Sequence, residues 1–243
     1  MIITIDTKTI TFFQKTLIDW FKKHGRDLPW RKTRNPYHIL VSELMLQQTQ
    51  VIRVEKEFYS QFLKKFPSFQ ALAKAEEEEV IESWEGLGYY NRARNLHKIA
   101  KIIVSEYDGR IPADYKKILE LPGIGQYTAG AILSFAFELD FPIVDTNVDR
   151  IIKRVFLHNH KITSPAKLEK IIWDISEQLL IKNNAWTFNQ AILDFGALIC
   201  IAIKPRCNKC PMRPICQFFQ AKISKKDSIM YWVNSDKNRS RKE

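Results

Sequence analysis

The sequence predicts an all-α fold of about ten helices joined by short connections. Apolar residues recur at the three- and four-residue spacing of amphipathic helices through most of the chain. No convincing run alternates apolar and polar residues with the period of two that marks a strand. With 243 residues and 45% apolar composition, the chain can bury the core of one large domain or of two small lobes.

The first part of the chain predicts three helical stretches. Residues 9–23 form an amphipathic helix, and the following Pro29 breaks it because proline disfavours helix in the preceding residue. A long helical pattern covers residues 39–65, with an interruption expected near Thr49. Pro67 and Ser68 then open a new helix over residues 69–75.

A glycine-bearing turn at residues 84–90 separates an acidic helix from a basic one. The glutamates at 76–79 suggest a metal site, but a solvated helix face with acids near its N-terminus explains them better. Residues 91–107 predict the basic helix, in which Ala93, Leu96, Ile99, Ala100 and Ile103 form the apolar face. We expect its basic residues to lie elsewhere on that helix: Arg92, Arg94, Lys98 and Lys101.

Residues 121–147 contain the two features most suggestive of function, a glycine hairpin and an aspartate. Two glycines in a five-residue hairpin, 121–125, stand between predicted helices at 113–120 and 127–137, so backbone amides at a helix N-terminus can bind phosphate. Asp145 follows an apolar run at the expected N-cap of the next helix, and it is a candidate catalytic acid. Further amphipathic helices are expected at 148–156 and 168–180.

The charge balance favours a polyanionic partner. The formal net charge is +11, and residues 201–243 hold eleven Lys or Arg against three acidic residues. No export signal opens the chain, and no apolar stretch approaches membrane-spanning length. We therefore expect a cytoplasmic monomer that does not bind membranes, and nucleoid association if the source is prokaryotic.

Four cysteines lie close together with the spacing C-x6-C-x2-C-x5-C: Cys200, Cys207, Cys210 and Cys216. In a cytoplasmic protein such a set is more often a metal-ligand set than a pair of disulfides. Zinc and a [4Fe-4S] cluster are the two candidates, and both remain open on spacing. The cluster is favoured because only the middle pair has the short spacing of a zinc knuckle.

These pieces together resemble the helix-hairpin-helix DNA glycosylase superfamily, in its endonuclease III-like branch, and most closely its adenine-specific subfamily. The motifs that carry the resemblance are 28–31 (LPWR), 42–51 (SELMLQQTQV), 84–90 (WEGLGYY), 92–98 (RARNLHK) and 188–197 (FNQAILDFGA). The resemblance implies a two-lobed fold. Residues 29–136 would form a six-helix barrel module with the hairpin, residues 1–28 and 137–220 a [4Fe-4S] lobe, and DNA would bind in the groove between them.

The resemblance also implies a catalytic set of Glu43, Asp145, Asn147 and Tyr127. Glu43 would protonate adenine, and its apolar neighbours favour the protonated form of a carboxyl group. Asp145 would stabilise the sugar cation or bond to it transiently, with Asn147 positioning it. Tyr127 stands where bifunctional relatives carry a Schiff-base lysine, so we expect a monofunctional enzyme that leaves an abasic strand. A surface glutamate and a plain helix N-cap remain the structural alternatives for Glu43 and Asp145.

Binding roles follow from the same resemblance. Gln48 and Tyr89 match side chains that enter the base stack, with Thr49 beside the opposing base. Trp30, Arg31, Leu46 and Gln190 match the walls of an adenine pocket, although ordinary core positions also explain Trp30 and Leu46. The hairpin residues would bind DNA phosphate, and their carbonyls can hold a monovalent cation: Gly123, Gly125, Gln126 and Thr128.

The predicted function is removal of adenine paired with guanine or 8-oxoguanine in double-stranded DNA. Adenine-specific relatives carry a further C-terminal domain that reads 8-oxoguanine, whereas residues 221–243 are too few for one and predict a flexible basic tail. Two alternatives stay open: a thymine or uracil glycosylase acting on mismatches with guanine, and a non-catalytic, cluster-containing DNA-binding module.

Overall fold

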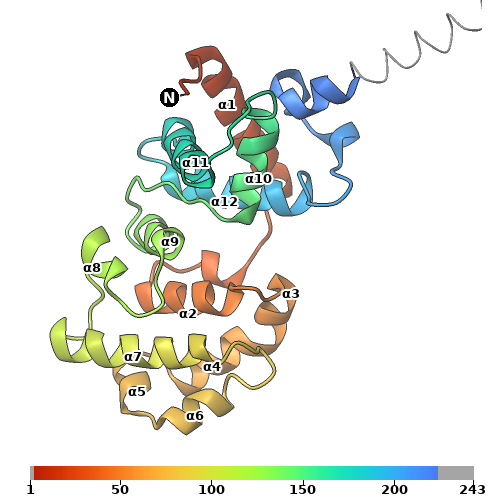
Figure 1. Ribbon diagram of the computed structural model, residues 1–243. Helices are drawn as coiled ribbons and strands as arrows, with labels where there is room; N and C mark the ends of the chain where they lie inside the picture. Colours follow the sequence, from red (N-terminus) through yellow and green to blue (C-terminus); the bar gives the residue numbers. More distant parts are fainter. Residues whose placement is uncertain (1–2, 224–243) are drawn as a thin grey trace, which may run out of the picture. The chain divides into compact units, whose positions relative to one another are not determined.

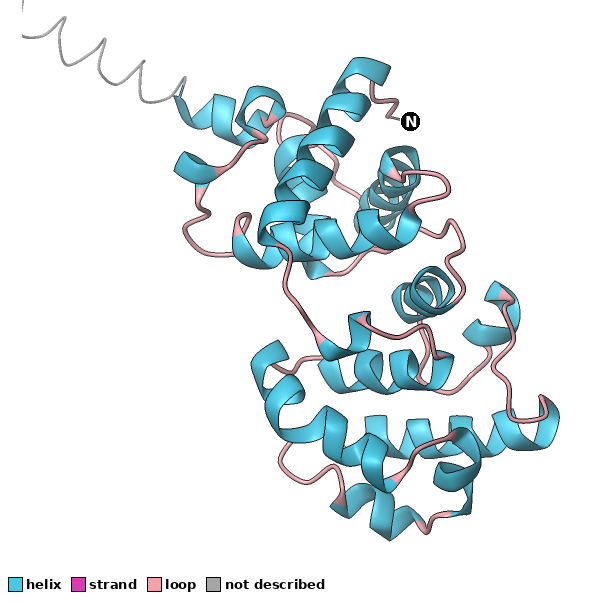
Figure 2. Cartoon of the chain, turned by 180° about the vertical axis from the view of Figure 1, so that it is seen from behind, coloured by secondary structure: helices cyan, strands magenta, loops and turns pink. Residues whose placement is uncertain are grey.

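The computed structural model describes residues 3–223, and all regular structure in that range is helical. Figure 2 shows helices and loops, and no strand occurs among the described residues. The prediction of an all-α fold is therefore confirmed. None of the described helices is both long and apolar enough to cross a membrane. The predicted basic tail lies outside the described residues from position 224 onward.

The described chain divides into two compact units. The first, which we call the hairpin unit, comprises Arg26–Ile143 and Leu180–Asn189. The second, which we call the cysteine unit, comprises the described residues up to Gly25, Val144–Leu179 and the described residues from Gln190 onward. We predicted a module ending at residue 136, whereas the hairpin unit continues to Ile143 and takes in a later segment as well.

Hydrogen bonds explain why the hairpin unit includes the later segment. Asn189 Nδ2 donates to Ser134 Oγ and to the Phe141 carbonyl, each at 2.8 Å. The Asn183 amide donates to both carboxylate oxygens of Asp140 at 2.9 and 3.0 Å. Residues 180–189 are therefore bonded both to helix α9 (Gln126–Ala136), which contains Ser134, and to the chain that follows it. Sequence periodicity cannot reveal such long-range contacts.

The helices of the hairpin unit, α2 to α9 in Figure 1, pack around one cluster of buried apolar side chains. Its elements in chain order are η1 (Pro29–Arg31), α2 (Pro36–Leu46), α3 (Val51–Arg53), η2 (Val54–Phe58), α4 (Tyr59–Lys65), α5 (Phe69–Lys74), α6 (Glu77–Glu82), α7 (Asn91–Glu106), α8 (Tyr115–Leu119) and α9 (Gln126–Ala136). Helix α2 packs against both α7 and α9, and α5 and α6 pack on α7. Nearly every residue of α2 from Tyr37 to Met45 is buried, as expected of a central helix.

The long helical pattern predicted at residues 39–65 proves to be several elements. Helix α2 begins earlier than predicted, at Pro36, because the Asn35 side chain caps it by accepting from the Tyr37 amide at 2.9 Å. The predicted interruption near Thr49 is confirmed, since α2 ends at Leu46 and α3 starts at Val51. A π-helical turn, η2, then precedes α4.

The described part of the cysteine unit contains α1 (Thr7–His24), α10 (Thr146–Val155), α11 (Pro165–Leu179), part of α12 (Ala185–Leu198), η3 (Cys207–Lys209) and η4 (Arg213–Ile215). A further helical segment covers residues 217–223. Helix α12 enters this unit at Gln190. Asp6 caps α1 by accepting from the Thr9 amide at 3.0 Å. Helix α1 packs through its predicted apolar face, with Trp20 edge-on to Phe195 and Phe13 tilted against Phe156.

Candidate functional site

Asp145 is the N-cap of helix α10, as predicted. Its Oδ1 accepts hydrogen bonds from the amides of Asn147 and Val148, both at 2.8 Å. Its other oxygen, Oδ2, accepts from Asn147 Nδ2 at 2.7 Å. A cap of this kind contributes about 1 kcal/mol to helix stability. The backbone amides hold Oδ1, and the Asn147 side chain holds Oδ2. Contacts to both oxygens therefore determine the orientation of the Asp145 carboxylate.

Arg150, one turn further along α10, continues this network to the cysteines. Its Nη2 donates to Asn147 Oδ1 at 2.6 Å and to the Gly196 carbonyl at 2.9 Å. Its Nε donates to the Cys200 carbonyl at 2.7 Å. The amide of Asn147 is thereby held from both ends, and a continuous chain of contacts joins a cysteine residue to Asp145. Nothing in the sequence around Arg150 predicts this role.

Gly196 is the point of close approach between α12 and the start of α10. A Cβ atom at this position would lie 2.5 Å from Asn147 Cβ and 3.3 Å from its Cα. Real Cβ atoms do not approach other carbons this closely, so a larger residue would displace Asn147. The glycine was part of a quoted motif, but its role depends on a contact that the sequence does not reveal.

Burial changes the acid–base behaviour of Asp145. It raises the pKa of the carboxyl group above its ordinary value. Hydrogen bonds from Val148 and Asn147 and the charge of Arg150 act in the opposite direction. Capping favours the ionised carboxylate, and desolvation by burial opposes it.

Glu43 lies in the middle of helix α2 with only 6% of its surface exposed. Its neighbours Leu44 and Met45 are fully buried. The alternative of a surface glutamate is therefore wrong. A carboxylate at such a position needs a partner or a function, because an uncompensated buried charge is costly.

The hairpin presents amides at the start of helix α9, as predicted. Gly123 adopts a left-handed backbone with φ of 77°, and a Cβ there would also meet the Asn95 side chain at 2.2 Å. The first intrahelical bond runs from Ala129 N to the Gly125 carbonyl at 2.9 Å, so the helix itself does not use the amides of Gln126 and Thr128. Thr128 is buried as a whole residue, with 3% of its surface exposed, whereas Gly125 and Gln126 before it are exposed. Tyr127 is half-buried in the first turn.

The predicted intercalating side chains stand at two neighbouring loops. Gln48 and Tyr89 are both exposed, Tyr89 by 60%, and both adopt left-handed backbones with φ of 56° and 50°. A hollow of about 430 Å³ lies beside them and is lined by Gln47, Gln48, Tyr89, Tyr90, Asn91, Arg92 and Arg94. Left-handed backbone in residues other than glycine is uncommon and tends to occur at functional sites.

Arg92 joins these two loops, and its predicted position was wrong. We expected it away from the apolar face of α7, yet it is 7% exposed. The spacing along the helix could have predicted this burial. Arg92 precedes Leu96 by four residues and Ile99 by seven, so it lies on the same face as they do. Burial lowers the pKa of its guanidinium from the ordinary value, but an arginine remains charged.

The residues predicted to line a base pocket differ in burial and in contacts. Trp30 is buried in the core and packs edge-on against Tyr59, and Leu46 packs partly buried against the same core. Gln190 is buried at 4% exposure on α12. Arg31 Nη1 donates to the Arg26 carbonyl at 2.8 Å.

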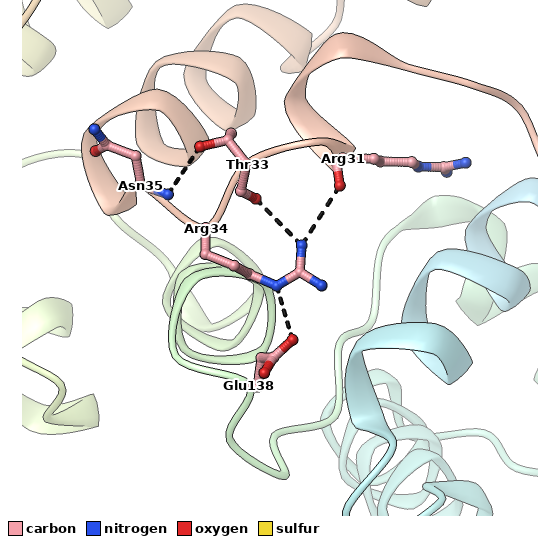
Figure 3. A network of polar contacts seen from close by, with 5 residues as sticks. All are labelled: Arg31, Thr33, Arg34, Asn35 and Glu138. Atoms are coloured by element: carbon pink, nitrogen blue, oxygen red, sulfur yellow. Dashed lines mark hydrogen bonds and ion pairs between the residues drawn. The ribbon is translucent and has the colours of Figure 1, made fainter.

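Arg34 braces the loop that carries Trp30 and Arg31 (Figure 3). Its Nη1 donates to the Arg31 and Thr33 carbonyls at 3.4 and 3.3 Å, and its Nε donates to Glu138 at 2.8 Å. The guanidinium also lies 4.4 Å from the centre of the Trp186 ring. The sequence does not predict this role of Arg34, because it depends on contacts with the distant residues Glu138 and Trp186.

The four cysteines line a single pocket, and the other side chains around it include Phe195, Met212 and Phe218. Burial and the other three thiols raise the pKa of Cys210 to about 12. Arg154 lies beside them, with Nη1 3.5 Å from Cys200 Sγ. No three His, Cys, Asp or Glu residues among those described form a group that could hold a metal ion. The donor set and its cationic neighbour nevertheless suit a thiolate-bound group that spans the whole pocket.

Comparison with known proteins shows the family to which the chain belongs. The model of the HhH-GPD superfamily of base excision DNA repair proteins matches residues 41–178, a range that contains Glu43, the hairpin and Asp145. The chain belongs to this superfamily. The resemblance predicted from the motifs is thereby confirmed.

Several members of the HhH-GPD superfamily are similar over most of the chain. An adenine DNA glycosylase of Buchnera aphidicola subsp. Baizongia pistaciae is 40% identical over 95% of this chain and 63% of its own length. A thymine/uracil-DNA glycosylase of Methanothermobacter thermautotrophicus is 34% identical over 86% of this chain and 93% of its own. The solved structure of a thermostable thymine-DNA glycosylase superposes with a TM-score of 0.81, at 33% identity, over 88% of this chain and 98% of that one. The chain thus spans less than two thirds of the adenine-specific relative.

Proposed function

We propose that this protein is a monofunctional DNA glycosylase that removes adenine paired with guanine or 8-oxoguanine. The observation that carries the proposal is the capped, doubly oriented carboxylate of Asp145, next to Asn147 and Arg150. A 40% identity to an adenine DNA glycosylase over 95% of the chain supports the choice of adenine.

The chemistry assigns one role to each carboxyl group. Glu43 gives its proton to N7 of adenine, so that the base leaves as a neutral molecule. The bond from C1′ of the sugar to N9 breaks, and its electron pair stays with the base. Asp145 faces the positive charge that develops on the sugar, and a water molecule adds to C1′ and returns a proton to Glu43. Adenine and an intact strand with an abasic sugar are the products.

Tyr127 supports the absence of strand cleavage. A Schiff base with the sugar requires an amine, and a phenol at this position in the first turn of α9 cannot supply one. Lys116 and Lys117 are exposed on helix α8, before the hairpin, and we assign them no catalytic part.

A [4Fe-4S] cluster held by Cys200, Cys207, Cys210 and Cys216 is part of the proposal. All four thiols line one pocket, whereas no three potential ligands among the described residues gather to hold a single ion. The cluster would supply a rigid anchor for the loop 201–206. Purified protein should be brown and contain iron; a colourless preparation with zinc and no iron would refute this assignment.

Double-stranded DNA is the proposed partner, and the net charge of +11 supports it. The amides at the start of α9 would bind a backbone phosphate, and carbonyls of the hairpin a monovalent cation. We propose a monomer acting in the cytoplasm, on nucleoid DNA if the source is prokaryotic.

Thymine or uracil opposite guanine is the second candidate substrate. The 34% identity to a thymine/uracil-DNA glycosylase over 86% of this chain supports it. The motif 47–50 (QQTQ) and the turn 86–90 (GLGYY) favour adenine.

One assay distinguishes the candidates. The protein is incubated with duplexes that hold A:8-oxoguanine, A:G, T:G or U:G, and half of each sample is then heated in alkali. We expect breaks at adenine after alkali only. Breaks confined to T:G or U:G would overturn the adenine assignment, and breaks without alkali would refute monofunctionality. Binding without breaks in any duplex would favour a non-catalytic DNA-binding module.

A further inference from the structure

Arg92 is a single buried side chain that bonds to the last turn of helix α2 and to two separate loops. Its Nη1 donates to the Leu44 and Met45 carbonyls at 2.9 and 2.8 Å and to the Gln47 carbonyl. Its Nη2 donates to Thr49 Oγ1 at 3.2 Å and to the Leu87 and Gly88 carbonyls at 3.1 and 3.0 Å. The first loop, 47–50, carries Gln48, and the second, 86–90, carries Tyr89. The same guanidinium thus contacts the residues on both sides of Gln48 and the two residues before Tyr89.

The acceptors of Arg92 are all neutral. The six contacts go to five carbonyls and one hydroxyl, and the ring centres of Trp84 and Tyr89 lie 5.6 and 5.5 Å from the guanidinium carbon. A buried charge is expensive, and a carboxylate would satisfy it more simply. The carbonyls of Leu44 and Met45 belong to the end of α2, and those of Gln47, Leu87 and Gly88 to the two loops. Bonding to backbone carbonyls in both loops constrains the backbone there, which an ion pair would not do.

The geometry that Arg92 stabilises is costly. Gln48 and Tyr89 each occupy a left-handed backbone region, at about 1 kcal/mol or more per residue. Both side chains are nevertheless exposed, and burial in the core does not compensate for the strain. An exposed amide and an exposed aromatic ring held in strained conformations indicate a surface prepared for a partner.

We propose that Arg92 is a positioning residue that makes Gln48 and Tyr89 into one rigid two-pronged wedge for opening the base stack. The inference rests on the proposed function, since a base must leave the duplex before it can be removed. Side chains that enter between bases lower the cost of unstacking only if they are already in place. Two independent mobile loops would each have to be ordered on DNA.

A lysine cannot replace Arg92 in this role. It keeps the charge, but its single ammonium has three donors and no planar fork, so it cannot bond to both loops at once. Arg92→Lys therefore separates charge from geometry. Lys101→Gln is the matched control, because Lys101 is exposed on the same helix and contacts neither loop.

The test reads base opening without base removal. In the Asp145→Asn background, 2-aminopurine at the target position reports unstacking by its fluorescence. We expect Arg92→Lys to weaken opening of a fully paired duplex about a hundredfold, and to leave opening nearly unchanged when the target lies in a preformed bulge. Lys101→Gln should behave as the parent protein does. Equal losses on both duplexes, or no loss on the paired one, would overturn the proposal.

Coupling between the prongs gives a second readout. Gln48→Ala and Tyr89→Ala should have strongly non-additive effects with Arg92 present and additive effects with Arg92→Lys. Additive effects in both backgrounds would contradict a single wedge. If Arg92→Lys does not fold, Thr49→Val removes one of the six contacts, and a smaller loss confined to the paired duplex is expected; no loss would refute the role.

The outcomes also separate this inference from the proposed function. Opening that depends on Arg92, in a protein that releases no base, would leave the wedge standing and remove the glycosylase assignment. Base release that does not depend on Arg92 would support the glycosylase assignment and refute the positioning role of Arg92.

Discussion

Arg150 Nη2 donates to Asn147 Oδ1 at 2.6 Å, and this contact orients the amide that in turn bonds to Asp145. Because Arg150 donates to the oxygen of Asn147, it favours the rotamer in which Nδ2 faces the carboxylate. The arginine is itself fixed by the Gly196 and Cys200 carbonyls. The orientation of the candidate catalytic carboxylate therefore depends on residues that never contact it.

Replacing Arg150 by lysine should lower the rate of base removal while DNA binding persists. A lysine cannot contact Asn147 and both carbonyls together, and misplacement of a reacting group costs about a hundredfold. Single-turnover kinetics would show a lower rate constant for base removal, and steady-state kinetics would show an unchanged KM. Lys153→Ala is the control, since its exposed ion pair with Asp149 on the same helix contributes little. A higher KM with an unchanged rate constant would contradict the positioning role.

Gly196→Ala should reduce activity by displacing Asn147. The added Cβ would lie 2.5 Å from Asn147 Cβ, so the start of α10 must shift. Overpacking of this kind costs about 1–3 kcal/mol of folding free energy. We expect a rate no higher than that of Asn147→Ala, measured on folded protein well below its unfolding temperature. Activity equal to that of the unmodified protein would show that the network tolerates the shift.

Asp145→Asn tests the acid–base behaviour of the carboxyl group through stability. The folded-state pKa is raised above 3.8, so the folded protein holds the proton more tightly than the unfolded chain does. Ionisation therefore costs stability, and this cost grows as pH rises from 3.8 through the folded-state pKa. The asparagine variant does not ionise. Its unfolding free energy relative to the unmodified protein should rise from acid to neutral pH, as measured by denaturant titration. The opposite trend would mean that the hydrogen bonds outweigh burial.

Tyr127→Lys should introduce strand cleavage. An amine in the first turn of α9 could form a Schiff base with the sugar, as the tyrosine cannot. Borohydride should then trap a covalent complex with DNA, and breaks should appear without alkali. Tyr127→Phe is the control and should yield neither product. A lysine variant that folds and removes the base, yet gives no trapped complex, would place position 127 away from the sugar.

Local chemistry made much of the fold predictable. Asp145 was recognised as a cap because a carboxylate followed an apolar run and preceded an amphipathic helix, and the hairpin because glycines separated two helical patterns. The break near Thr49 followed from the same periodicity. The burial of Glu43 was expected from its apolar neighbours, and it was found.

Contacts between distant parts of the chain were not predictable. Arg92 bonds to residues more than forty positions earlier, and Arg150 to a carbonyl fifty positions later. Helix α7 placed Arg92 on its apolar face by spacing, but a basic residue there was interpreted as a surface charge. The role of Gly196 depends equally on which helix packs against it. Such residues support the candidate site, and only tertiary structure identifies them.

The most direct test of the central claim is to identify the base that is released. The protein is incubated with a duplex holding one A:8-oxoguanine pair, and free bases are separated by chromatography. The account predicts that adenine is released by the unmodified protein and that Asp145→Asn releases none while still binding the duplex. Release of no base from this duplex, or release undiminished by Asp145→Asn, would contradict it.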